Sequence, residues 1–127
     1  MKRGKAPTAR QKRWHDAVAQ LPCVSCGATP VHVHHCVGST TKHNKVWIGQ
    51  DWVIPLCYDC HQGPGGVHGD MSRVRRMIGH DDISRKAFEK LMFDEAVIAV
   101  TDWCGITLDS AILPPADTHN AIMDYHK

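Results

Sequence analysis

The chain has 127 residues, of which 43% are hydrophobic, and this length suits one compact domain with tails. No apolar run approaches the ~20 residues that a membrane-spanning helix needs, so we expect no membrane partner. The basic first five residues have no apolar segment behind them, which argues against a secretory signal and for a protein of the cytoplasm.

The formal net charge is only +2, but the charges are distributed unevenly. Residues 1–22 carry six Lys or Arg against one acid, whereas residues 91–127 carry six acids against one base. A basic front and an acidic tail suit a polyanionic partner on one side of the molecule, although ordinary solvated surfaces explain the charges equally well. The candidate phosphate contacts are Lys2, Arg3, Lys5, Arg10, Lys12, Arg13, Arg73, Arg75 and Arg76.

The first half of the chain predicts one helix and two strands. Residues 1–9 are polar and basic, which is typical of a disordered tail. Apolar residues at helical spacing predict an amphipathic helix over residues 9–21, and alternation over residues 31–34 predicts a strand. Residues 36–50 indicate a loop, after which residues 52–54 predict a second strand.

The second half predicts helices. A helix should begin near Tyr58, and residues 63–66, Gly-Pro-Gly-Gly, must interrupt it. Helical structure resumes over about residues 71–78, and the longest helix, capped by Asp82 or Ser84, covers about 83–102 and ends at Gly105. Only a helical stub is expected near residues 121–123. We divide the chain into a basic tail (1–9), a core (10–80) and a C-terminal helical extension with its tail (81–127).

The spacing of the cysteines predicts a zinc site. Cys23 and Cys26 form one CxxC pair, and Cys57 and Cys60 form another. Each CxxC turn directs two sulfurs at one point, so two such turns complete a tetrahedral four-cysteine zinc site. A redox-active CxxC is the main competing interpretation. Outside this frame, Cys36 and Cys104 are interpreted as small buried hydrophobic residues.

Histidines stand inside the cysteine frame. His34 and His35 are adjacent at the end of the first predicted strand, His61 directly follows Cys60, and His68 follows a glycine-rich turn. This arrangement, with Asp51 between the pairs, resembles the HNH endonuclease family over about residues 20–70. Within that family, the runs around residues 53–63 and 67–70 look most similar to phage recombination-associated nucleases, including the recombination-enhancement (Ref) type.

The resemblance implies a fold and a set of roles. The fold is a small α+β domain, with a zinc-stapled ββα-metal core of treble-clef type and flanking helices. The implied activity is metal-dependent hydrolysis of DNA phosphodiester bonds with weak sequence preference. His35 is the implied general base, His34 and His61 are implied metal ligands, and His68 is our candidate for the third ligand.

The middle residue of the HNH motif is where this chain departs from the family. The family has an Asn five residues before the third cysteine, and Trp52 occupies that position here. Asp51 is the best substitute and Asn44 the alternative, since either side chain could orient the base histidine or bind the ion.

The implied cofactors are a structural Zn²⁺ and a catalytic divalent ion such as Mg²⁺ or Mn²⁺. The implied partners are DNA and a recombination protein. The location is then the host cytoplasm if the gene belongs to a phage, and both a monomer and a dimer are compatible with the sequence.

Two other classes of function stay open. One is a zinc-bound DNA-binding module without catalysis, which has no use for the four clustered histidines. The other is an adaptor that presents the 83–102 helix to a partner, and its sign is an apolar helix face exposed in the monomer. The histidines outside the motif, His15 and His32 among them, are assigned to the surface and given no role.

Overall fold

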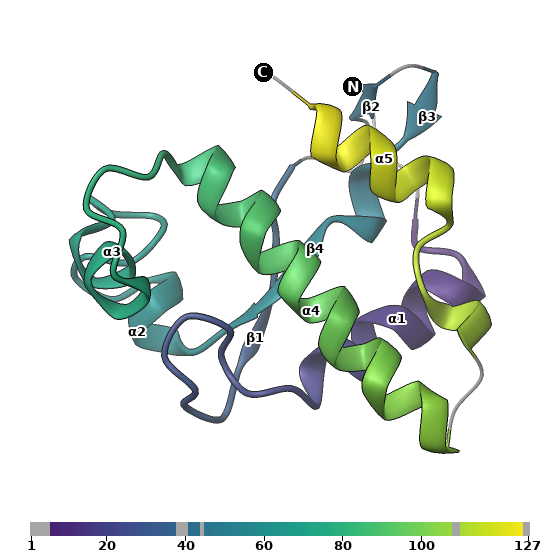
Figure 1. Ribbon diagram of the computed structural model, residues 1–127, viewed down its shortest axis with the longest axis horizontal. Coiled ribbons are helices and arrows are strands. Elements are labelled where there is room, and N and C mark those ends of the chain that lie inside the picture. Colours follow the sequence, from purple (N-terminus) through teal and green to yellow (C-terminus); the bar gives the residue numbers. More distant parts are fainter. Residues whose placement is uncertain (1–5, 38–40, 44, 108–109, 126–127) are drawn as a thin grey trace.

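A computed structural model describes residues 6–37, 41–43, 45–107 and 110–125, and it has a small α+β architecture (Figure 1). The elements in chain order are α1 (Ala9–Ala19), β1 (His32–His35), β2 (Lys42–His43), β3 (Val46–Trp47), the 3-10 turn η1 (Gly49–Asp51), β4 (Val53–Leu56), α2 (Tyr58–His61), α3 (Ser72–Ile78), α4 (Arg85–Thr107), the 3-10 turn η2 (Ser110–Ile112) and α5 (Ala116–Asp124).

The centre of the molecule is an antiparallel pair formed by β1 and β4, in which His34 lies opposite Ile54 and His35 opposite Val53. Every residue of β4 is buried, because α1 and α4 both pack against it. The predicted pair of strands is therefore confirmed, with β1 displaced by one residue and β4 beginning at Val53.

Aromatic side chains from three elements fill the core between the sheet and the helices. Trp14 of α1 meets Phe93 of α4 edge to face, with ring centroids 6.3 Å apart. Trp52, just before β4, is fully buried and donates a hydrogen bond from Nε1 to the Glu89 carbonyl, 3.2 Å away. Trp52 therefore connects β4 to α4 and belongs to the core.

Both long helices begin at side-chain caps. Thr8 and Gln11 form a reciprocal capping box at the start of α1, and the Ser84 hydroxyl accepts a hydrogen bond from the Ala87 N–H at the start of α4. The predicted end of the long helix at Gly105 is wrong, since α4 continues to Thr107. An interior glycine costs about 1 kcal/mol relative to alanine, which is too little to stop a helix with a long buried face.

The structure contains a hairpin that was not predicted and a C-terminal helix that was expected only as a stub. The loop between the central strands contains a small antiparallel hairpin of β2 and β3, and the C-terminal stub is a nine-residue helix, α5. Strands of two residues leave almost no periodic signal. A helix as short as α5 is marginal by itself and is stabilised here by burial of Thr118, Ala121 and Ile122.

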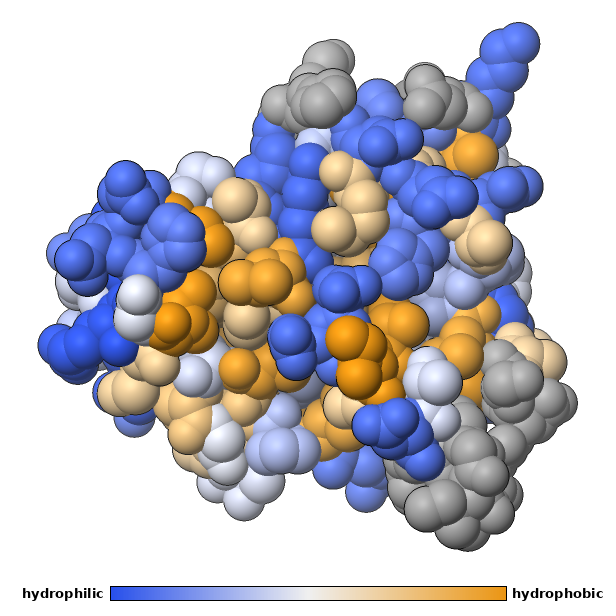
Figure 2. All heavy atoms as spheres, viewed as in Figure 1, coloured by the Kyte–Doolittle hydropathy of each residue, from blue (hydrophilic) through white to orange (hydrophobic). Residues whose placement is uncertain are grey.

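The outer face of α4, which crosses in front of the sheet in Figure 1, carries apolar side chains at the surface. Leu91 is 42% exposed and Ile98 is 49% exposed, and Figure 2 shows orange side chains gathered over this helix. Among the described residues, no helix is long and apolar enough to cross a membrane.

Candidate functional site

The two CxxC pairs converge as the sequence predicts. The four sulfurs of Cys23, Cys26, Cys57 and Cys60 all lie within 4.8 Å of one another, and the Cys26 and Cys57 sulfurs are 3.5 Å apart. Four sulfurs at about 2.3 Å from one tetrahedral zinc stand about 3.8 Å apart, so the cluster fits a structural zinc ion.

The backbone conformation of the first CxxC turn brings Cys23 and Cys26 together. Gly27 has a φ of +82°, which only glycine adopts readily, and its N–H donates to the Cys23 carbonyl at 2.7 Å. Burial acts to raise the pKa of the Cys26 thiol, but hydrogen bonds from the Ala28 backbone and from the other cysteines outweigh it and lower that pKa to about 7. Cys26 is therefore readily available as a thiolate ligand.

Arg73 lies against the same cluster. Its Nη2 is 4.0 Å from the Cys26 sulfur, and hydrogen bonds to the sulfurs of Cys60 and Cys26 are the main cause that raises its pKa. A guanidinium in this position offsets the negative charge of four thiolates around a dication. The structure therefore places Arg73, which was predicted to contact DNA, against the cysteine cluster.

Three histidines form a second cluster. Ring nitrogens of His34, His61 and His68 lie within 4.8 Å of one another, and the ring centroids are 4.8–5.2 Å apart. His34 comes from the buried face of β1, His61 from the last residue of α2, and His68 from the turn that follows. Three convergent imidazoles suit a divalent transition-metal ion, whereas Mg²⁺ prefers oxygen ligands, so among the implied divalent ions the residues fit a transition metal.

Glycines bring His68 back to α2. A Cβ on Gly63 would stand 2.7 Å from Cα of Asp59, and a Cβ on Gly66 would stand 2.8 Å from the Cys60 carbonyl oxygen. Only glycine permits this close approach at both positions. The turn can then form hydrogen bonds to α2, including the one from the His68 N–H to the His61 carbonyl at 3.3 Å.

Glu89 is a site residue that sequence reasoning missed. It comes from α4, it is only 4% exposed, and its Oε2 lies 2.5 Å from Nε2 of His34. Because a carboxylate accepts hydrogen bonds, Nε2 of His34 carries the proton and Nδ1 is left for an ion. Carboxylates commonly orient metal-binding imidazoles in this way. The sequence did contain one signal for a buried carboxylate, because Glu89 stands among the apolar residues Phe88, Met92 and Phe93 of the predicted helix.

His32 is exposed, as predicted, and it also contacts this group. Its Nδ1 lies 3.2 Å from Nδ1 of His61, and the tautomer in which His61 donates this hydrogen bond leaves Nε2 of His61 for an ion. The alternation of β1 places His32 and His34 on the same side of the strand. That alternation was visible in the sequence, but the position of His61 against it was not.

The histidine cluster favours neutral rings. Desolvation is the main cause that lowers the pKa of His61 to about 4, and the charges of His34, His68, His32 and Arg85 act in the same direction. Desolvation and the charges of His34 and Arg85 also lower the pKa of His68. Near neutral pH both rings therefore have a free nitrogen lone pair, which metal binding requires.

His35 lies next to this cluster but outside it. Its side chain is exposed, and its Nε2 is 3.1 Å from Oε1 of Gln50. An amide oxygen only accepts hydrogen bonds, so Nε2 of His35 carries the proton and Nδ1 is free to accept one. Gln50 thus provides the orienting contact that the sequence analysis assigned to its neighbour.

Asp51, which was predicted to take part in catalysis, is buried against α1. It is 1% exposed, and its carboxylate accepts hydrogen bonds from Nη2 of Arg10 at 2.6 and 2.8 Å and from Gln11 at 3.0 Å. Arg10, predicted to contact DNA, is therefore paired internally. Asn44, the other candidate, lies outside the described residues.

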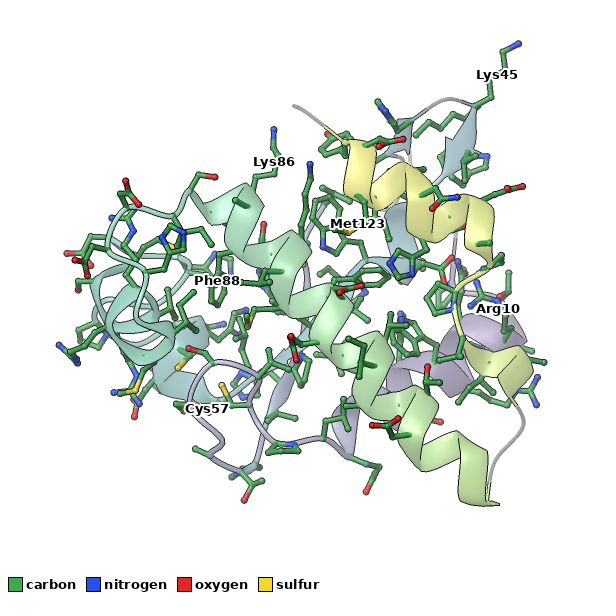
Figure 3. The ribbon with its side chains drawn as sticks, viewed as in Figure 1. Arg10, Lys45, Cys57, Lys86, Phe88 and Met123 are labelled. Atoms are coloured by element: carbon green, nitrogen blue, oxygen red, sulfur yellow. The ribbon has the colours of Figure 1, made fainter. Side chains whose placement is uncertain are left out.

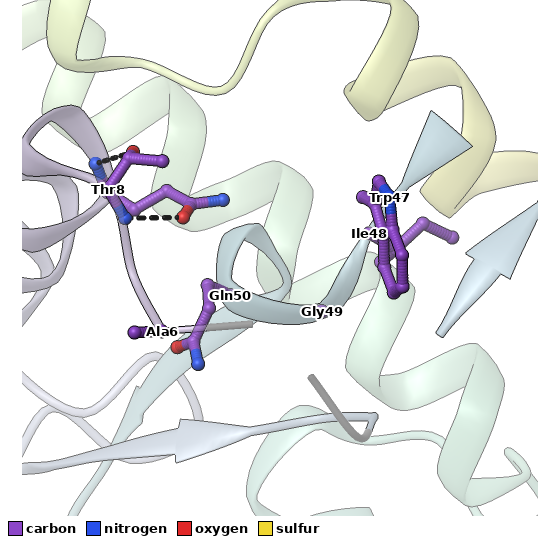
Figure 4. A pocket seen from close by; sticks show the side chains of 7 residues that line it. Ala6, Thr8, Trp47, Ile48, Gly49 and Gln50 are labelled. Atoms are coloured by element: carbon purple, nitrogen blue, oxygen red, sulfur yellow. Dashed lines mark hydrogen bonds between the residues drawn. The ribbon is translucent and has the colours of Figure 1, made fainter. Parts of the chain in front are cut away.

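Helix α1 holds the η1 turn at further points. Nε2 of His15 lies 2.6 Å from the Gln50 carbonyl oxygen, and Nε1 of Trp14 donates to the Asp51 carbonyl at 3.0 Å. The His15 ring also meets the His35 ring edge to face at 5.3 Å. Figure 4 shows Gln50 beside Gly49, lining a small pocket of about 160 Å³ that faces Thr8 at the start of α1.

The remaining predicted DNA contacts differ in their surroundings. Nε of Arg75 donates to the Ile83 carbonyl at 3.1 Å, which ties α3 to the segment before α4. The side chains of Lys12, Arg13 and Arg76 are exposed. Lys2, Arg3 and Lys5 lie outside the described residues.

Comparisons with known proteins add one finding. No curated protein and no solved structure matches the chain. A family model described as "Protein of unknown function (DUF968)" matches residues 1–94, a span that includes both clusters as well as Gln50 and Glu89. Because the match covers well over half of the 127 residues, the chain belongs to the DUF968 family.

Proposed function

We propose that the protein is a metal-dependent endonuclease of the HNH type, which hydrolyses phosphodiester bonds in DNA with weak sequence preference. The observation that carries this proposal is the arrangement of the histidines. Three imidazoles converge on one point, and a fourth, His35, is exposed directly beside them with a hydrogen-bond partner that leaves its Nδ1 free.

The ligands of the catalytic ion are His34, His61 and His68. A divalent ion bound there supplies Lewis-acid stabilisation of the phosphate and of the leaving oxygen. Glu89 and His32 hold two of the imidazoles by their opposite nitrogens, so the donors are oriented before an ion arrives. The four cysteines hold a separate, structural zinc in this proposal.

His35 is the general base. Its neutral ring accepts a proton at Nδ1 from the attacking water, while Oε1 of Gln50 retains the hydrogen bond from Nε2. Adjacent residues of a strand point to opposite faces, and His34 is 2% exposed whereas His35 is exposed. The strand therefore presents a metal ligand on its inner face and a proton acceptor on its outer face.

The test is nicking of supercoiled plasmid by purified protein with Mg²⁺, Mn²⁺, Co²⁺, Ni²⁺ or Zn²⁺. The His35→Ala variant should keep its zinc and its fold and lose nicking by a factor on the order of 10²–10⁴. The His34→Ala variant should instead be partly rescued by excess ion.

His80→Ala is the matched control, because His80 is an exposed histidine at the end of α3 whose contact is Asp82. It should nick at the wild-type rate. Wild-type nicking by His35→Ala would show that the base is another residue.

The adaptor alternative has one observation in its favour, the exposed Leu91 and Ile98 on the outer face of α4. A protein that binds zinc but nicks no plasmid with any of these ions would support that alternative, or the non-catalytic DNA-binding module. Salt-dependent DNA binding would then distinguish the module from the adaptor.

A further inference from the structure

A hollow of about 400 Å³ lies beside the histidine cluster, and its wall includes Glu89 and Cys36. Glu89 is the residue that holds His34, and Cys36 follows His35 directly in the chain. One wall residue of the hollow therefore contacts the candidate metal ligand, and another is the chain neighbour of the candidate base.

Two cations line this hollow, and both come from the first turn of α4. Nε of Arg85 lies 3.4 Å from Oε2 of Glu89, and the Arg85 side chain is 43% exposed. Figure 3 shows Lys86 extending away from the start of α4. Its ammonium lies 5.3 Å from the ring centroid of Tyr125, which also lines the hollow.

The charges of the hollow do not cancel. Glu89 is the acidic residue in its wall, and its carboxylate is shared between His34 and Arg85. Two cations against one shared carboxylate leave the hollow positive. The charge of Arg85 also acts on the rings of His61 and His68, which places it near the candidate metal ligands.

Other arginines have different tasks. Arg10 is paired with Asp51, Arg73 with the cysteine cluster and Arg75 with a backbone carbonyl. Arg85 and Lys86 are the cations that line the hollow next to the site.

We propose that this hollow is a nucleic-acid subsite, in which Arg85 and Lys86 bind a backbone phosphate next to the scissile one and Tyr125 contacts the attached nucleoside. The proposal rests on the proposed function for its substrate class. Arg presents a planar fork that matches phosphate oxygens, and Lys adds a point charge. An aromatic wall suits the flat face of a nucleobase.

The test is binding of a fluorescein-labelled DNA duplex of mixed sequence, measured by anisotropy at several salt concentrations without added divalent ion. Each phosphate contact that is lost lowers the slope of log affinity against log salt by about 1. We expect Arg85→Gln and Lys86→Gln each to lower this slope by about 1, and the double variant by about 2.

Lys90→Gln is the matched control, because Lys90 lies one turn further along α4 and its ammonium donates to the Met123 carbonyl at 3.1 Å. It should leave the slope unchanged. Thermal melting and zinc content report whether each variant is folded. If Arg85→Gln does not fold, two other variants still decide the outcome. Lys86→Gln should lower the slope, and Arg85→Lys, which keeps the charge, should keep most of it.

Tyr125→Ala should weaken binding of a single-stranded oligonucleotide more than Tyr125→Phe does. Wild-type slopes in Arg85→Gln and Lys86→Gln would overturn the subsite and leave the nuclease proposal intact. Reduced slopes in these variants, together with a wild-type protein that binds DNA but never nicks it, would support the subsite while the proposed catalysis fails. Inorganic phosphate is also tested as a competitor of the labelled duplex. If millimolar phosphate displaced the labelled duplex as effectively as unlabelled duplex does, the assignment to a nucleic acid would be overturned.

Discussion

At the scale of single residues, the site depends on which nitrogen of each imidazole is held. Glu89 holds Nε2 of His34, His32 holds Nδ1 of His61, and Gln50 holds Nε2 of His35. The oxygen acceptors of Glu89 and Gln50 place the proton on Nε2 and leave Nδ1 of His34 and His35 available, and the tautomer in which His61 donates to His32 leaves Nε2 of His61 available.

Gln50→Ala should lower the nicking rate by about 10²-fold, because the His35 ring loses the contact that orients it. Asp51→Asn should lower the melting temperature but leave the rate per folded molecule close to wild type, since Asp51 contacts Arg10 and not His35. Single-turnover kinetics check the rates, and ¹⁵N NMR of the imidazoles should show the Nε2-protonated form of His35 in the wild type and a mixture in Gln50→Ala. The reverse ranking of the two variants would restore Asp51 to the catalytic role.

Glu89→Gln should weaken binding of the catalytic ion by about 10- to 100-fold, because an amide holds the His34 ring less strongly than a carboxylate does. Calorimetric titration of the zinc-loaded protein with Mn²⁺ measures this directly. Glu95→Gln, on the exposed side of the same helix, is the control and should bind Mn²⁺ like the wild type. Equal affinities in all three proteins would remove Glu89 from the site.

The acid limb of the rate profile should lie below pH 6.5. Desolvation is the main cause that lowers the pKa of His35, and the charges of His15 and His34 act with it, whereas the hydrogen bond that His35 donates to Gln50 acts to raise this pKa. A lowered pKa keeps the ring neutral, and thus able to accept a proton, to a lower pH than usual. Nicking between pH 5 and 8, with circular dichroism at each pH, separates loss of the base from loss of the fold. A rate that already falls above pH 7 would contradict this assignment.

At the scale of elements, α1 acts as a clamp on the η1 turn. Arg10, Gln11, Trp14 and His15 all form hydrogen bonds to Gln50 or Asp51. The N-terminal helix therefore sets the position of the side chain that holds the candidate base, although α1 lies outside the cysteine frame.

Arg10→Ala should destabilise the fold by about 2–3 kcal/mol, because it leaves the buried Asp51 carboxylate without its main partner. The value lies below the range for fully buried pairs because Arg10 is 24% exposed. Urea unfolding measures it. Arg10→Met combined with Asp51→Leu should recover part of the loss, since no unpaired buried charge remains; a double variant as unstable as the sum of the two single variants would argue against the ion pair as the cause.

At the scale of the whole molecule, the cysteine cluster connects segments that are far apart in the chain. Cys23 and Cys26 precede β1, whereas Cys57 directly precedes α2 and Cys60 lies within it. A metal bound by all four would fix α2, and with it His61, against the sheet.

Removal of zinc by a strong chelator should therefore unfold the domain or lower its melting temperature by tens of degrees, because structural zinc contributes folding free energy directly. Cys57→Ser should have the same effect, whereas Cys36→Ser should not, since Cys36 lies outside the cluster. Metal analysis should find about one zinc per chain. A well-folded protein without zinc would contradict the interpretation of the cluster.

The sequence by itself determined the members of the four-cysteine cluster and of the three-histidine cluster. The CxxC spacing brings two sulfurs together within each turn, and the strand-knuckle order brings the two turns together, so the four-cysteine cluster was predictable. The same holds for His34, His61 and His68, which follow those turns closely. The helices predicted over residues 9–21, from near Tyr58 and over about 71–78 correspond to α1, α2 and α3, because local periodicity and glycine residues specify them.

Only the tertiary structure decided which partners hold those residues. Glu89 is 55 positions from His34 and reaches it because α4 packs across the sheet. The choice between Gln50 and Asp51 depends on how α1 holds the η1 turn, since neighbouring side chains of a turn point in different directions and the sequence shows neither direction. Long-range packing sets both contacts, and a pattern of residue types along the chain contains no information about such distances.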